Sequence, residues 1–212
     1  MAYFLIFISA IFVNNIVLSQ FLGICPFLGV SKKIDTALGM GAAVTFVLTV
    51  ATVVTYLLQQ LMLNIGASMF PDDPEALVNS LQTIVFILVI AALVQMIEII
   101  LKKISPALYQ ALGVFLPLIT TNCCILGVAL IVADPDKLSA KLPGEALGAN
   151  LLTGTLFAFA TAIGFALALV IFAGIREQLA LAKVPKAMQG TPIALLTAGL
   201  LAMAFMGFSG VV

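Results

Sequence analysis

The 212-residue chain is 63% hydrophobic and only 8% charged, and its mean hydropathy is +1.27. A soluble domain is about half apolar, so this composition excludes a soluble globular protein and predicts a chain that lies in a lipid bilayer. The net charge is zero, which excludes a broad basic surface for nucleic acid. The absence of histidine excludes His-ligated haem, Rieske clusters and His-rich zinc sites.

Long uncharged segments predict the membrane spans in chain order. About 20 apolar residues cross the ~30 Å of hydrocarbon in a bilayer, and six uncharged segments exceed that length. They are residues 1–31, 36–71, 76–97, 104–133, 146–175 and 187–212. We therefore predict an all-α integral membrane fold with six transmembrane helices. The expected spans are residues 3–20, 37–63, 81–101, 106–133, 146–175 and 191–212.

The charges between these spans predict their orientation. The first, third and fifth loops contain seven of the nine basic residues, whereas the second and fourth contain only Lys137 and Lys141 beside six acidic residues. By the positive-inside rule, the odd loops face the cytoplasm and both termini lie outside. The fifth loop is expected to be the basic segment from Arg176 to Gly190.

The first and fourth uncharged segments, residues 1–31 and 104–133, contain an internal repeat. FLGICPFLGV begins at Phe21, and FLPLITTNCCILGV begins at Phe115. Cys25 and Cys123 are 98 positions apart, and the Leu-Gly-Val triplets that follow them have the same offset. Because each half of the chain contains three spans, residues 1–103 and 104–212 are expected to form two inverted three-helix repeats.

Both repeated segments contain residues that interrupt a helix. Pro26 suits the first position of a second half-helix, and Thr120, Thr121 and Asn122 are helix-capping types directly before Cys123. The first and fourth spans are therefore expected to contain broken helices. Broken backbone at membrane depth is tolerated only where protein or a polar site satisfies the freed amides, so the two breaks indicate a ligand or a partner.

Cys25 and Cys123, one from each repeat, are the candidate metal ligands. Thiolates near half-helix N-termini are stabilised by free N–H groups, and a metal would share their charge. Two thiolates cannot complete a tetrahedral site, so another chain would supply two more, and four cysteines around two irons are the usual ligands of a [2Fe–2S] cluster. The competing hypotheses are a secondary transporter, which also uses broken inverted repeats, and a scaffold in which both thiols only pack.

The remaining polar and small residues in the spans are interpreted as packing groups. Cys124 has no counterpart beside Cys25 and faces about 100° away from Cys123 on a helix, which favours a packing role. Asn14, Asn15 and Gln95 are expected to form hydrogen bonds between helices. Small residues spaced four apart are expected to let helices approach closely inside the bundle. Such pairs include Ala37 with Gly41 and Ala160 with Gly164.

Four segments of the chain resemble a known family of membrane proteins. They are FLGICPFLGVSKK from Phe21, LGVFLPLITTNC from Leu112, AGIREQLA from Ala173 and TAGLLAMAFMGFSG from Thr197. This RnfA/NqrE family includes RnfA of the Rnf complex, an ion-translocating ferredoxin:NAD oxidoreductase, and NqrE of the sodium-pumping NADH:quinone oxidoreductase. The ICPF and TTNC motifs are more similar to the Rnf members.

The resemblance implies a role in electron transfer across the bacterial cytoplasmic membrane. Cys25 and Cys123 match the two cluster-binding positions of the family, and the homologous protein RnfE would supply two more cysteines. The shared [2Fe–2S] cluster would pass electrons through the bilayer while Na⁺ or H⁺ is exported. RnfB, RnfC, RnfD and RnfG would be further partners. The chain has no nucleotide-binding fingerprint, so it would be one component of the translocase without a complete active site.

Overall fold

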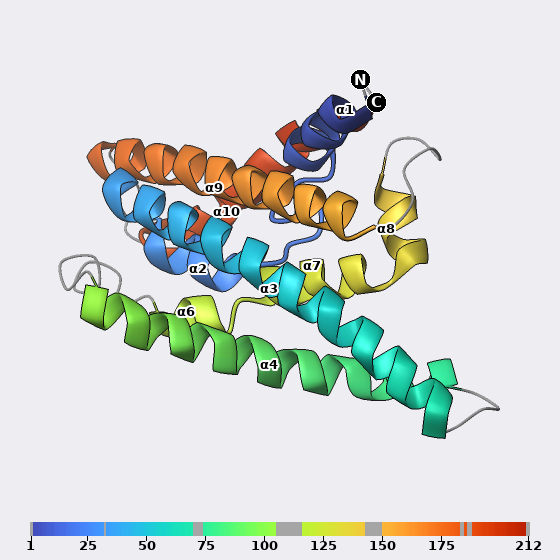
Figure 1. The fold of residues 1–212 in the computed structure, drawn as a ribbon. Coiled ribbons are helices and arrows are strands. Elements are labelled where there is room, and N and C mark those ends of the chain that lie inside the picture. Colours follow the sequence, from blue (N-terminus) through green and yellow to red (C-terminus); the bar gives the residue numbers. More distant parts are fainter. Residues whose placement is uncertain are drawn as a thin grey trace.

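A computed structural model describes residues 2–31, 33–69, 74–104, 116–142, 150–182, 185 and 188–210. The regular elements within these ranges are all helices, which confirms the predicted all-α class for this part of the chain (Figure 1). They are α1 (Ala2–Ile8), the π-helix η1 (Ser9–Val13), α2 (Ile24–Val30), α3 (Ile34–Met69), α4 (Pro74–Ile104), α6 (Leu116–Thr120), α7 (Cys123–Ala133), α8 (Pro135–Lys141), α9 (Leu151–Leu181), α10 (Thr191–Met206) and the 3₁₀ helix η3 (Gly207–Gly210).

Three helices in the described residues are long and apolar enough to cross a membrane. They are Ile34–Ile65, Leu81–Ile100 and Leu151–Leu181. A fourth span results if Pro117–Ala133 and Pro135–Lys141, which are bent by 105°, are counted as one. Phe4–Val13 and Thr191–Met206 are shorter apolar helices inside the first and sixth expected spans. The arrangement of six spans as an inverted repeat stays a prediction.

Helices α3 and α9 run side by side through the centre of the molecule (Figure 1). Small residues permit this close approach, because a Cβ atom added to Gly41 would lie 2.8 Å from the Cβ atom of Ala166. Gly164 is also confined, since an added Cβ would lie 3.1 Å from the Cα atom of Ile11. The predicted role of these small residues in internal packing is therefore confirmed.

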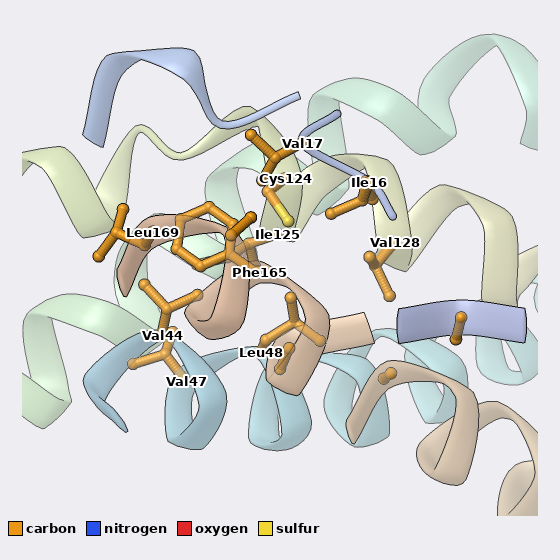
Figure 2. Packing of buried hydrophobic residues seen from close by; sticks show 14 of the residues in the cluster. Ile16, Val17, Val44, Val47, Leu48, Cys124, Ile125, Val128, Phe165 and Leu169 are labelled. Atoms are coloured by element: carbon orange, nitrogen blue, oxygen red, sulfur yellow. The ribbon is translucent and has the colours of Figure 1, made fainter. Parts of the chain in front are cut away.

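The core lies where α7 meets α3 and α9 (Figure 2). Phe165 on α9 is fully buried among Leu48 of α3 and Ile125 of α7, and the irregular segment after η1 adds Ile16. In contrast, α4 carries many exposed large apolar side chains, including Ile84, Leu88, Met96 and Ile99. An apolar surface of this kind suits contact with lipid or a partner chain.

The predicted C-terminal boundary of the first span is wrong. The helix was expected to continue to about Gln20, but it ends with η1 at Val13, and regular structure resumes only at Ile24. Pro26 is the third residue of α2 rather than the first, because Gly23 occupies the N-cap. The physical reason is the side chain of Asn15, whose hydrogen bonds replace those of a continuous helix and are described below.

The helix of the fifth expected span extends further at its C-terminal end than predicted. Helix α9 continues to Leu181, so Arg176 lies on a helix rather than in a loop. A polar side-chain contact explains the extension, because Arg176 binds the end of α2 and is thereby held inside the bundle. The predicted starts of the fourth and fifth spans, at residues 106 and 146, lie outside the described residues.

Candidate metal centre

The two repeated motifs lie in direct contact. The backbone N–H of Gly23 donates a hydrogen bond to the Sγ atom of Cys123 at 2.9 Å. A Cβ atom added to Gly23 would lie 3.2 Å from Cβ of Cys124 and 3.3 Å from Oδ1 of Asn122. The start of α2 therefore packs against the start of α7, although the two segments are about a hundred positions apart in the sequence.

The side chain of Asn15 forms hydrogen bonds with backbone groups at the first helix break. Its Nδ2 group donates to the carbonyl oxygen of Gly164 on α9 at 2.8 Å and to that of Ile11 at 3.0 Å. Its Oδ1 atom accepts from the backbone N–H groups of Val17 and Leu18. The residue is 1% exposed. A single amide side chain thus partners backbone groups that a continuous helix would have paired, and the predicted interhelical role of Asn15 is confirmed.

Replacing Asn15 by the similarly sized leucine is expected to destabilise the break. Unsatisfied buried backbone groups cost about 1–3 kcal/mol each, so we expect Asn15→Leu to lower the stability of the protein by more than about 2 kcal/mol. Asn14→Leu is the matched control, because within the described residues the Nδ2 group of Asn14 has one recorded hydrogen bond, to Oγ of Ser9 at 3.3 Å. Thermal unfolding of the detergent-solubilised protein checks the difference. Equal unfolding midpoints for the two variants would contradict this role.

The second break is capped as the sequence predicts. Asn122 is the N-cap of α7, and its Oδ1 atom accepts from the backbone N–H of Cys124 at 3.0 Å. The Nδ2 atom of this buried side chain has no hydrogen-bond partner in the described structure. The cap fixes the first turn of α7 and therefore the direction in which the Cys123 side chain projects from the helix.

The three thiols differ in exposure. Cys124 is fully buried in the core beside Ile125 and Phe165, which confirms its predicted packing role (Figure 2). Cys25 and Cys123 are both exposed on the surface of the chain. Among the described residues, no group of three or more His, Cys, Asp or Glu side chains could hold a metal ion.

Arg176 holds the opposite end of α2, a role that the sequence analysis missed. Its Nη1 atom donates to the carbonyl oxygen of Leu28 at 2.8 Å and to Oγ of Ser31 at 2.9 Å. Phe27 on α2 also stacks on Phe172 of α9, with ring centroids 4.2 Å apart. A cation at a helix C-terminus satisfies the last carbonyls. The available signal was that Arg176 is the only arginine in the sequence.

The described helices have the features of one class of protein. Long apolar helices, apolar surfaces and broken helices with internally paired backbone are those of an all-helical integral membrane protein. The family model described as Rnf-Nqr subunit, membrane protein, matches residues 3–212, and the chain belongs to this family.

Several curated proteins are similar to the chain over nearly their full length. The chain is 58% identical to the A component of the Na⁺-translocating ferredoxin:NAD⁺ oxidoreductase complex of Acetobacterium woodii, over 97% of this chain and 95% of that protein. It is 55% identical to the A component of the ion-translocating oxidoreductase complex of Syntrophotalea carbinolica, over 98% of this chain and 96% of that protein. The protein of the same description from Citrobacter koseri is 50% identical to the chain, over 99% of this chain and 97% of that protein.

Proposed function

We propose that the chain is the corresponding membrane component, RnfA, of an ion-translocating ferredoxin:NAD oxidoreductase complex. The observation that carries this proposal is the high identity over nearly the whole length to the A components of such complexes. The chain would thus be part of an enzyme whose ferredoxin and NAD chemistry takes place on other subunits. RnfB, RnfC, RnfD and RnfG are the further partners that this assignment implies.

Cys25 and Cys123 would supply two of the four ligands of a [2Fe–2S] cluster. The homologous protein RnfE would supply the other two cysteines from an oppositely oriented copy of the same fold. Two observations support the fit: both thiols are exposed at the surface of this chain, and the third is buried in the core. Four thiolates are the usual ligand set of such a cluster, and when bound it is a one-electron carrier inside the membrane.

Other residues of the chain would prepare the thiols for this role. The Gly23 N–H donates to Sγ of Cys123, and such a bond stabilises negative charge on the sulfur. Asn122 fixes the start of α7, and Arg176 fixes the end of α2. Cys25 and Cys123 are thereby attached to elements that pack on each other, which limits how far the thiols can move.

The arrangement in the membrane is proposed from the sequence pattern. Residues 1–103 and 104–212 would form inverted repeats of three spans each, with broken helices in spans one and four. The 98-residue offset of Cys25 and Cys123 supports this, and so does the beginning of a helix directly at both motifs, α2 and α7. With the basic loops inside, the chain would lie in the bacterial cytoplasmic membrane with both termini on the outer side.

The iron content of the membrane pair tests the proposed cofactor. The chain is co-purified with its homologous partner, and iron and acid-labile sulfide are measured without added metal. We expect two irons and two sulfides per pair, and both values should fall to near zero in Cys25→Ser. The secondary-transporter hypothesis gives a different result. It predicts an iron-free pair, together with substrate uptake by this chain alone in liposomes.

A further inference from the structure

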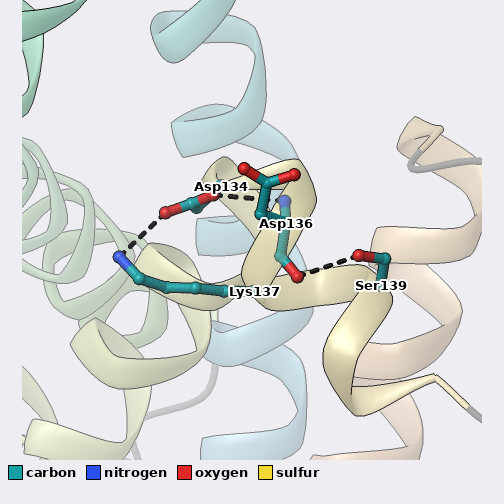
Figure 3. A network of polar contacts seen from close by, with 4 residues as sticks. All are labelled: Asp134, Asp136, Lys137 and Ser139. Carbon is teal, nitrogen blue, oxygen red and sulfur yellow. Dashed lines mark hydrogen bonds and ion pairs between the residues drawn. The ribbon is translucent and has the colours of Figure 1, made fainter.

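Two consecutive helices begin with the same kind of cap but with different side chains. Asn122 caps α7, and its Oδ1 atom accepts from the backbone N–H of Cys124 at 3.0 Å. Asp134 caps α8 in the same way, because its Oδ1 atom accepts from the N–H of Asp136 at 3.2 Å (Figure 3). The Asp134 carboxylate is also paired with the Lys137 ammonium at 2.8 Å. Asparagine and aspartate cap a helix about equally well, so capping alone does not explain the amide at α7.

The amide of Asn122 keeps the first turn of α7 uncharged. The residue is 3% exposed, and its Nδ2 group has no hydrogen-bond partner in the described part of the chain, so this donor contributes nothing to the cap. A carboxylate at the same position would have no donor to leave unpaired, but it would add a buried negative charge. Residues 14–31 and 116–133, which contain both repeated motifs, include no charged residue that could pair with it.

The side chain of Asn122 also contacts the residue that donates to the candidate ligand. A Cβ atom added to Gly23 would lie 3.3 Å from Oδ1 of Asn122, and the Gly23 N–H donates to Sγ of Cys123 at 2.9 Å. These two contacts on one residue hold the Asn122 oxygen and the Cys123 sulfur within about 9 Å of each other. A charge in place of the amide would therefore act on the sulfur through buried protein, where screening is weak.

We propose that Asn122 is a positioning residue that keeps the reduction potential of the iron–sulfur cluster high. This inference rests on the proposed function. The potential of such a cluster depends on the net charge around it and on the hydrogen bonds to its sulfur atoms. Reduction adds one electron, so a nearby anion disfavours the reduced form, whereas an N–H bond to a ligand sulfur favours it. Asn122 acts on both, because it caps α7 without a charge and packs against Gly23, which donates to Cys123.

The reduction potential of the co-purified membrane pair tests the proposal. It is measured by potentiometric titration followed by electron paramagnetic resonance. At a fixed potential, we expect Asn122→Asp to lower the ratio of reduced to oxidised cluster at least tenfold, which corresponds to a shift of about 59 mV. Gln60→Glu is the matched control, because it makes the same change from amide to carboxylate at an exposed position. Gln60 lies about 18 Å along α3 from Leu48 in the core, so this variant should stay within about threefold of the wild type.

A second pair of variants keeps the test decisive if Asn122→Asp fails to fold. Asn122→Ala removes the cap and the contact with Gly23, so the ratio of reduced to oxidised cluster should fall at least about threefold. Asn122→Ser restores an uncharged capping oxygen and should return the ratio to within about twofold of the wild type. A purely structural residue would change the amount of cluster and not its potential. A wild-type potential in every Asn122 variant that assembles would overturn this inference alone, whereas an iron-free wild-type pair would overturn the proposed function as well.

Discussion

Cys123→Ser is expected to abolish the spectrum of the intramembrane cluster and to reduce ferredoxin:NAD electron transfer by the assembled complex at least a hundredfold. Serine is a poor ligand for iron, and the Gly23 N–H would then donate to a hydroxyl instead of a thiolate. Electron paramagnetic resonance of the reduced membrane pair and the turnover of the whole complex measure the two effects.

Cys124→Ser is the matched control, because it makes the same chemical change at the adjacent position. Cys124 is fully buried in the core, so its replacement buries a hydroxyl and lowers stability by about 1–3 kcal/mol without removing a ligand. The cluster spectrum should therefore survive in Cys124→Ser. Loss of the spectrum in this variant with retention in Cys123→Ser would reverse the assignment of the two thiols.

Gly23→Ala is expected to disrupt the contact between the start of α2 and the start of α7. Gly23 has φ +84°, and an added Cβ atom would lie 2.8 Å from the ring of Phe165. The left-handed backbone costs a non-glycine residue about 1–2 kcal/mol, and overpacking adds about 1–3 kcal/mol. We therefore expect a loss of stability of about 2–5 kcal/mol and a weakened cluster signal, measured by thermal unfolding and by the spectrum of the reduced pair.

Gly174→Ala is the control for this variant. Gly174 lies within α9, and an added Cβ atom would have no neighbour within 4 Å. Because alanine favours helix over glycine by about 1 kcal/mol, this variant should be as stable as the wild type or more stable. If Gly23→Ala unfolded at the same temperature as Gly174→Ala, the tight contact between α2 and α7 would not exist.

Local signals in the sequence correctly predicted several parts of the fold and site. Composition predicted the membrane class, and the capping preference of asparagine predicted the start of α7 at Cys123. The helical angle between adjacent residues separated Cys124, which is buried, from Cys123, which is exposed. These features depend on a residue and its near neighbours, so the sequence alone contains them.

Features that depend on contacts between distant segments were not predictable in the same way. The end of the first helix at Val13 depends on the hydrogen bond from Asn15 to Gly164, and an asparagine inside an expected span does not identify its distant partner. The inward position of Arg176 likewise depends on the carbonyl of Leu28. A basic residue near the end of an apolar span ordinarily indicates a loop, and the contact was visible only in three dimensions.

The proposed function depends on Cys25 and Cys123 binding one iron cluster together with a neighbouring chain. A density map of the assembled complex at the interface of this chain with its homologous partner tests this most directly. We predict two iron atoms at that interface, within bonding distance of the sulfur atoms of Cys25 and Cys123 and of two cysteines from the partner. Sulfur atoms that point apart, with no heavy atoms between the chains, would contradict it.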